Sequence, residues 1–221
     1  MRHLAQPRTL RLAGIAALAT TLACYLRLAF WLNRSDPVWL LTVLLFLCSI
    51  VLWSFVFAWH TQYTRRPVFT FKIEPRLFIT VTAAGIAVAT VYHLFLDPSL
   101  RLKTPEEYPA NVKQWLALVL FSIAFNQLFF VFAPFAWLMR LFQNQRMAMV
   151  LTVLFGAAVL AFKIHSTPAP ISSASFATFL AGRVVMGFLA VSFYLRGGVF
   201  LSWWWTLLIE ARHLLDLAGN S

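Results

Sequence analysis

The sequence predicts an all-α fold, a polytopic bundle of about seven transmembrane helices with the N-terminus inside and the C-terminus outside. Of the 221 residues, 61% are hydrophobic and only 11% are charged, and the mean hydropathy is +0.78. The apolar residues are gathered in runs close to the ~20 residues that a helix needs to cross a bilayer. Short polar segments containing Pro, Gly and Arg separate these runs. This composition excludes an ordinary soluble domain.

The charge distribution and the cysteine count argue against a nucleic-acid-binding protein and against a disulfide-stabilised domain. The net charge of +11 does not indicate a nucleic-acid partner, because Lys and Arg lie between the apolar runs rather than in a basic cluster. Two cysteines cannot form a disulfide framework. Cys24 and Cys48 lie equally far from Asp36 in predicted neighbouring spans, so we expect reduced, apolar-packed thiols at similar depth. No metal-ligand spacing or phosphate loop appears, so we expect no cofactor, and a metal only if the chain is catalytic.

The N-terminal segment has two features of a signal peptide. Arg2, Arg8 and Arg11 precede an apolar run, and residues 21–24 resemble a lipoprotein cleavage site. The apolar run continues past Cys24, however, which is too long for the apolar region of a signal peptide. We therefore expect a retained first span.

The first three spans are predicted over about residues 10–32, 38–62 and 77–96. Small residues spaced four apart on the first span should allow close approach of a neighbouring helix; they are Ala13, Ala17 and Thr21. Residues 67–76 alternate like a strand but have no partner strand, so we expect an interfacial segment on the bilayer surface. Residues 97–112 form the longest polar loop.

Four more spans are predicted over about residues 111–142, 147–164, 173–195 and 199–217. Pro134 removes a backbone hydrogen bond and should kink or end its helix near Phe130. A second ridge of small residues lies on the sixth span, at Ala174, Thr178 and Gly182. Arg196, Gly197 and Gly198 form a turn that makes the last two spans antiparallel neighbours.

The distribution of Lys and Arg favours the N-in, C-out orientation. With this orientation, the inner segments carry more of these residues than the outer ones. The inner set is Arg2, Arg8, Arg11, Arg65, Arg66, Lys72, Arg76, Arg140, Arg146 and Arg196, and the outer set is Arg34, Arg101, Lys103, Lys113, Lys163 and Arg212.

Two neighbouring amides, Asn126 and Gln127, lie in the middle of the fourth span. An amide without a partner in hydrocarbon costs roughly 2–7 kcal/mol. We therefore expect both side chains to point into the bundle, toward the fifth to seventh spans. Two interpretations stay open: a functional site at membrane depth, or hydrogen bonding that joins helices.

Opposite charges lie deep in the last two spans, at Arg183 and Glu210. Both are almost equally far from the turn at Gly197, so their depths should match within about one residue rise of 1.5 Å. Because intramembrane charges usually pair, we predict that Arg183 and Glu210 form an ion pair. His213 and Asp216 lie on the same helix face as Glu210.

Three short segments, in order, resemble motifs of the CAAX-processing and bacteriocin self-immunity intramembrane proteases (the CPBP or Abi family). Residues 126–131, Asn-Gln-Leu-Phe-Phe-Val, are similar to the Glu-Glu-x-x-Phe-Arg motif of that family. Residues 155–159 are similar to its Phe-x-x-x-His motif, and residues 194–198 to its Tyr-x-Arg-Thr-Gly turn. The resemblance covers residues 111–217. It implies a four-span core over residues 111–221, preceded by a three-span region with the interfacial segment over residues 1–110.

The chain lacks the residues to which the resemblance would assign the catalytic chemistry of that family. Asn126 and Gln127 stand in place of the two Glu, Val131 in place of the Arg and Val159 in place of the His, and residues 207–214 contain no His-x-x-x-Asn motif. An amide cannot act as a general base. The function predicted from the sequence is therefore a non-catalytic binding or complex-forming protein of the bacterial inner (cytoplasmic) membrane. Its partners would be the lipid bilayer and a membrane protein or peptide.

Two alternatives stay open. The first is an active intramembrane peptidase in which other residues replace the missing ones; the candidates are Glu210, His213 and His165. A pocket that contains both Glu210 and a His would favour this enzyme. The second is an accessory subunit of a membrane complex whose His60 or His93 ligates a pigment or haem.

Overall fold

The computed structural model describes residues 6–30, 36–103, 108–165 and 173–219, and in these ranges the chain is helical without a strand. Helix α1 spans Pro7–Ala29, and α2 spans Val38–Phe55 before a π-helical turn, η1 (Val56–His60), and α3 (Thr61–Thr64). Helix α4 spans Pro75–Val91 and continues through the π-helical turn η2 (Tyr92–Leu96) into α5 (Asp97–Lys103). The elements that follow are α6 (Val112–Phe121), η4 (Ser122–Asn126), η5 (Leu128–Phe132), α7 (Ala133–Phe142), α8 (Gln145–His165), α9 (Ser173–Glu210) and α10 (His213–Gly219).

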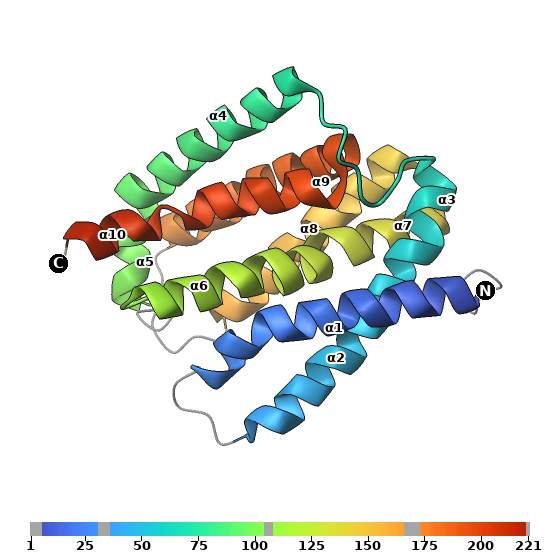
Figure 1. Cartoon of the computed structure of the whole chain (residues 1–221). Helices are drawn as coiled ribbons and strands as arrows, with labels where there is room; N and C mark the ends of the chain where they lie inside the picture. The colour runs from blue at the N-terminus through green and yellow to red at the C-terminus, as the bar shows by residue number, and fades with distance from the viewer. Residues whose placement is uncertain (1–5, 31–35, 104–107, 166–172, 220–221) are drawn as a thin grey trace.

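Within the described ranges, 6 helices are long and apolar enough to cross a membrane. The last of them, Phe176–Ala218, is interrupted at Gly198, where φ is 68°. The rings of Phe193 and Trp205 are 5.0 Å apart, whereas a straight helix would separate them by about 18 Å. Helix α9 is therefore folded back on itself at the turn that the sequence predicted, and its two halves lie side by side in Figure 1.

The turn at Gly198 is covered by the segment between α3 and α4. Val199 N donates to Val68 O at 3.0 Å, and Arg66 Nη1 donates to the Leu195 carbonyl. Val68 is buried, and Phe69 packs against the rings of Trp53, Phe57, Phe200 and Trp203. The segment expected to lie on the bilayer surface thus docks on the helix bundle, although Phe71 remains 84% exposed.

Helices α1 and α2 pack along the small residues predicted for this purpose. Ala13, Ala17 and Thr21 are buried, and Trp53 Nε1 donates to Thr20 Oγ1 at 3.0 Å. Both cysteines are free; Cys24 is buried, but Cys48 is exposed. The prediction of packed thiols is therefore wrong for Cys48, which lies outside the buried face of α2 formed by Leu45, Ser49 and Trp53.

The fourth span departs from α-helical geometry near Phe130, where Pro134 was expected to disturb the helix. The chain remains helical from Val112 to Phe142, but two π-helical turns, η4 and η5, lie on either side of Gln127. A π-helical turn contains more residues than an α-helical one, and such turns are frequent at functional sites.

The small residues of the sixth span pack only in part as predicted. Thr178 is exposed and the Ala174 side chain lies outside the described residues, but Gly182 is half-buried, and an added Cβ there would lie 3.8 Å from Tyr92 Oη. The close approach to α8 occurs at Gly187, where an added Cβ would lie 3.2 Å from Val153. The second half of α9 is attached to α4, because Trp204 Nε1 donates to Thr82 Oγ1 at 2.9 Å.

Candidate functional site

A polar cavity of about 200 Å³ lies between η4, η5, α8 and the two halves of α9. Asn126 and Gln127 both line it, which confirms that the amides point into the bundle. Gln127 Oε1 accepts a hydrogen bond from Ser202 Oγ at 2.8 Å, and Asn126 Nδ2 lies 3.5 Å from Ser122 Oγ. The polar residues of the lining are Tyr92, Ser122, Asn126, Gln127, Thr152, Arg183, Thr206, Glu210 and Arg212.

Of the two roles that the sequence left open, the structure shows hydrogen bonding between helices for Gln127, and both amides line the cavity. Gln127 joins the fourth span to the second half of α9 through Ser202. Asn126 belongs to η4, whose π-helical turn directs its side chain toward the same cavity. Each amide keeps capacity for further hydrogen bonds, since a primary amide has two donors and one carbonyl acceptor.

Arg183 enters the cavity from the first half of α9. Its guanidinium lies over the Phe130 ring, 4.7 Å from the centroid, and beside Gly156, where an added Cβ would lie 3.2 Å from Nη2. Gly156 thus leaves the room that the guanidinium occupies. Among the described residues, no carboxylate lies within 4.0 Å of Arg183.

The predicted ion pair between Arg183 and Glu210 is wrong. Both side chains line the cavity, but Glu210 Oε2 lies 3.7 Å from Arg212 Nη1 and 3.6 Å from His213 Nε2. Their position in one cavity agrees with their similar distance from the turn along the chain. Depth does not fix the rotation of a helix about its axis, and that rotation turns Glu210 toward its own C-terminal neighbours.

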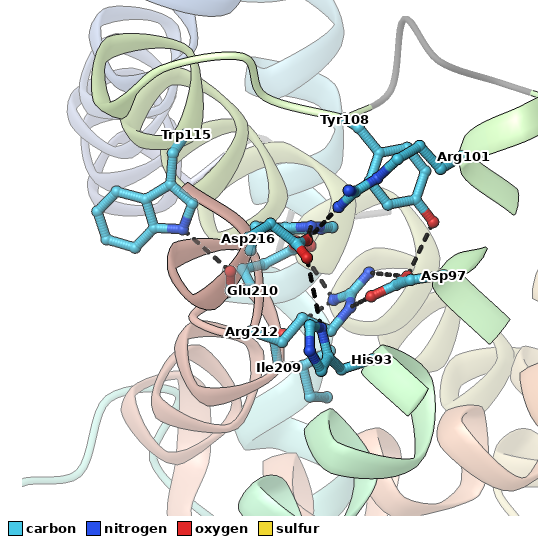
Figure 2. Close-up of polar contacts among 10 residues, drawn as sticks. His93, Asp97, Arg101, Tyr108, Trp115, Ile209, Glu210, Arg212 and Asp216 are labelled. Atoms are coloured by element: carbon cyan, nitrogen blue, oxygen red, sulfur yellow. Dashed lines mark hydrogen bonds and ion pairs between the residues drawn. The ribbon is translucent and has the colours of Figure 1, made fainter. Parts of the chain in front are cut away.

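A network of charged side chains continues from Glu210 toward the end of the bundle that α5 and α10 form (Figure 2). Arg212 Nε lies 2.9 Å from Asp97 Oδ2, and Tyr108 Oη donates to Asp97 Oδ1 at 2.8 Å. Burial and this hydrogen bond raise the pKa of the Tyr108 phenol, so the hydroxyl stays protonated and donates. Asp216 is paired with Arg101 and lies near His93 and His213.

Three residues of this network have the composition of a metal site. One ligand atom each of His93, Asp97 and Asp216 lies within 4.8 Å of the others. Both carboxylates are already paired with guanidinium groups, however, from Arg212 and Arg101. A divalent cation would have to displace these charges, so we assign no metal to the cluster.

The two histidines considered as cofactor ligands lie apart. His60 is buried, and its Nδ1 is hydrogen-bonded to Tyr194 Oη at 2.8 Å, close to the turn at Gly198. His93 belongs to the charged network at the other end of α9 (Figure 2). His60 therefore has the partner expected of a buried structural histidine.

The other predicted site residues are distributed as follows. Val131 is buried and lines the cavity, whereas Val159 is half-buried and is absent from the lining. His165 is exposed at the end of α8. His213 is next to Glu210 but does not line the cavity, so the lining contains no histidine among the described residues.

Sequence reasoning missed Asp97, Arg101, Tyr108 and Arg212, which hold the charged network together. The sequence placed Asp97 only at the start of the polar loop of residues 97–112, and Arg212 only among the outer charges. The signal in the sequence for their pairing was that Asp97 and Arg212 both lie at span ends on the same predicted side of the membrane. No protein-family model, curated protein or solved structure matches this chain.

Proposed function

We propose that this chain is an integral protein of the bacterial inner (cytoplasmic) membrane that binds an anionic group in its polar cavity without hydrolysing it. The group belongs to a small ligand, or to a segment of a membrane-protein or peptide partner. The observation that carries this proposal is Arg183, a guanidinium within a predicted span that lines the cavity and has no described carboxylate within 4.0 Å. Charges at membrane depth are almost always paired.

The lining of the cavity favours an anion over a cation. Glu210 is the one carboxylate among its described lining residues, and Arg212 and His213 already lie within 4.0 Å of it. A guanidinium can bind a carboxylate or phosphate through two parallel hydrogen bonds. Asn126 and Gln127 supply further donors on the same cavity.

The residues that line the cavity support binding rather than catalysis. The two amides cannot hold a proton near working pH. On this proposal, the chain keeps the scaffold of the CPBP-type proteases without their carboxylates. One observation favours the peptidase alternative, the distance of 3.6 Å between Glu210 Oε2 and His213 Nε2.

Thermal unfolding of the full chain in lipid nanodiscs tests the proposed binding. Acetate, inorganic phosphate and a short-chain phosphatidic acid serve as anionic probes, and choline serves as a cationic comparator. An anion that binds only the folded state at 100 times its Kd should stabilise it by about 2.7 kcal/mol. We expect a Tm increase with at least one anion and none with choline.

Arg183→Met should abolish that increase. Arg140→Met is the matched control, because Arg140 lies over the Trp59 ring at 4.5 Å in the same type of contact but does not line the cavity. The proposal fails if no anion stabilises the wild-type protein, or if Arg183→Met retains the effect. Cleavage of a transmembrane peptide by the wild type, lost in Glu210→Gln, would replace binding by the peptidase function.

A further inference from the structure

Four ionisable side chains, those of Glu210, His213, Asp216 and His93, follow one another from the cavity to the end of the bundle formed by α5 and α10. Figure 2 labels Glu210, Asp216 and His93. Glu210 lines the cavity. His213 Nε2 lies 3.6 Å from Glu210 Oε2, and His213 Nδ1 lies 3.9 Å from Asp216 Oδ2. Asp216 Oδ1 lies 3.7 Å from His93 Nδ1. The imidazole of His213 thus has a carboxylate at each of its two nitrogens.

Burial is greatest in the middle of this series. The His213 side chain is 3% exposed, whereas Glu210 and Asp216 are each 17% exposed, and Arg101, the partner of Asp216, is 42% exposed. Tyr108 covers His213 with an edge-to-face ring contact at 5.2 Å between centroids. Asp216 and its partner Arg101 are therefore partly exposed at the end of the bundle, and His213 lies between Asp216 and Glu210.

Two nitrogen atoms of the series have no hydrogen-bond partner. They are Nδ1 of His93 and Nδ1 of His213, both buried, and both face the Asp216 carboxylate. Buried polar atoms are nearly always hydrogen-bonded, so two such atoms around one carboxylate require an explanation. A site that exchanges protons provides such an explanation, because each nitrogen carries a proton only during part of the exchange.

Charges of both signs surround the series. Among the described residues, the ion pairs join three carboxylates, those of Asp97, Glu210 and Asp216, to the guanidinium groups of Arg101 and Arg212. Arg27 acts on Glu210 as well, so cationic groups lie near both carboxylates of the series. The titratable and charged groups around His213 and Glu210 come from several elements; they are Arg27, Tyr92, His93, Asp97, Arg101, Tyr108, Arg183, Glu210, Arg212 and Asp216.

We infer that Glu210, His213 and Asp216 form a proton-transfer path between the cavity and the aqueous end of the bundle. A proton leaves the Glu210 carboxyl and binds His213 Nε2, and the proton on His213 Nδ1 moves to the Asp216 carboxylate. His213 ends as the neutral Nε2–H tautomer, and Asp216 releases its proton to water or to His93 Nδ1. One proton crosses in each transfer. In the reverse transfer, Asp216 takes up a proton from water and passes it to His213 Nδ1, and Nε2 returns its proton to Glu210, which restores the Nδ1–H tautomer.

The distances set one requirement for this path. Each gap is longer than the 2.7–3.2 Å of a direct hydrogen bond, so the side chains must approach by roughly 0.5–1 Å, or a water molecule must bridge them. Chains of Glu, Asp and His are the usual proton conductors of membrane proteins. The inference does not depend on the anion proposed for Arg183, because it uses other side chains.

Infrared spectroscopy after a pH jump tests the path in the full chain in lipid nanodiscs. Glu210→Gln identifies the carboxyl band of Glu210, and the rate at which this band follows the jump is then measured in the wild type. His213→Gln and Asp216→Asn should each slow that rate by roughly 100-fold, the usual effect of one positioned proton-transfer group. His165→Gln is the matched control, since His165 is exposed on α8 and outside the network, and should leave the rate unchanged.

A folded His213→Gln or Asp216→Asn variant with the wild-type rate overturns the proposal, and so does a Glu210 band that does not respond to pH. If neither variant folds, ¹⁵N spectra of the wild-type His213 ring decide. Exchange between both tautomers supports the path. A single fixed tautomer at every pH overturns it.

Discussion

Asp97 and Arg212 form a buried ion pair, with 2.9 Å between Oδ2 and Nε, between residues 115 positions apart in the sequence. The Asp97 side chain is 3% exposed and that of Arg212 is 11% exposed. The pair connects the start of α5 with the end of α9, and Tyr108 adds a hydrogen bond to the same carboxylate. It therefore fixes the end of the bundle that holds the charged network.

Asp97→Asn should destabilise the protein by about 3–5 kcal/mol, because Arg212 would remain buried without its carboxylate. Asp97→Leu combined with Arg212→Met should recover part of this loss, since neither of these two charges is then left alone, although Glu210 loses the guanidinium 3.7 Å from its Oε2. Arg101→Met is the control; its side chain is 42% exposed, and its surface pair should contribute about 0–1 kcal/mol. Thermal unfolding in detergent measures all three, and an Asp97→Asn loss no larger than the control would contradict the prediction.

Gly198→Ala should destabilise the turn of α9 by at least about 1 kcal/mol. Gly198 has φ of 68°, and an added Cβ would lie 2.7 Å from the Val68 carbonyl oxygen. Gly14→Ala provides the comparison, because an added Cβ there meets nothing within 4 Å and the helix should gain roughly 0.5–1 kcal/mol. Equal Tm values for the two variants would show that the docking of Val68 on the turn does not stabilise the fold.

Thr20→Val should cost about 1–3 kcal/mol, since it leaves the buried indole N–H of Trp53 without its acceptor. Thr90→Val tests the same chemical change at an exposed position, where the hydroxyl donates only to Ile86 O of its own helix. That control should stay within about 0.5 kcal/mol of the wild type. Equilibrium unfolding of both variants compares them, and similar losses would show that the contact between α1 and α2 is not specific.

A reporter fused after the C-terminus should be placed outside the cytoplasm. The bias of Lys and Arg predicts this orientation, and α1 begins at the end of the bundle opposite to α10 (Figure 1). Alkaline phosphatase should be active and green fluorescent protein dark at the C-terminus. The opposite pattern is expected for fusions after Gln143, between α7 and α8, and the same pattern at both sites would refute the predicted orientation.

The sequence by itself determined the helical class and most helix boundaries. Hydropathy sets the length of each apolar run, and turn residues such as Pro37, Pro134 and Gly198 act through local backbone geometry. It also determined that Asn126 and Gln127 face the interior, because an unpaired amide in hydrocarbon is costly wherever it lies along the span. These conclusions depend on one residue and its immediate neighbours, so they could be drawn without the fold.

Only the tertiary structure decided the partners of the charged residues. Arg183 and Glu210 are similarly distant from the turn along the chain, yet Glu210 lies beside Arg212 and His213, while Arg183 lies over Phe130. Spacing along the chain gives the depth of a residue but not the rotation of its helix, which results from the packing of all neighbouring helices. The pairing of Asp97 with Arg212 depends on elements distant in sequence, and that long-range packing brings the cavity and the charged network together.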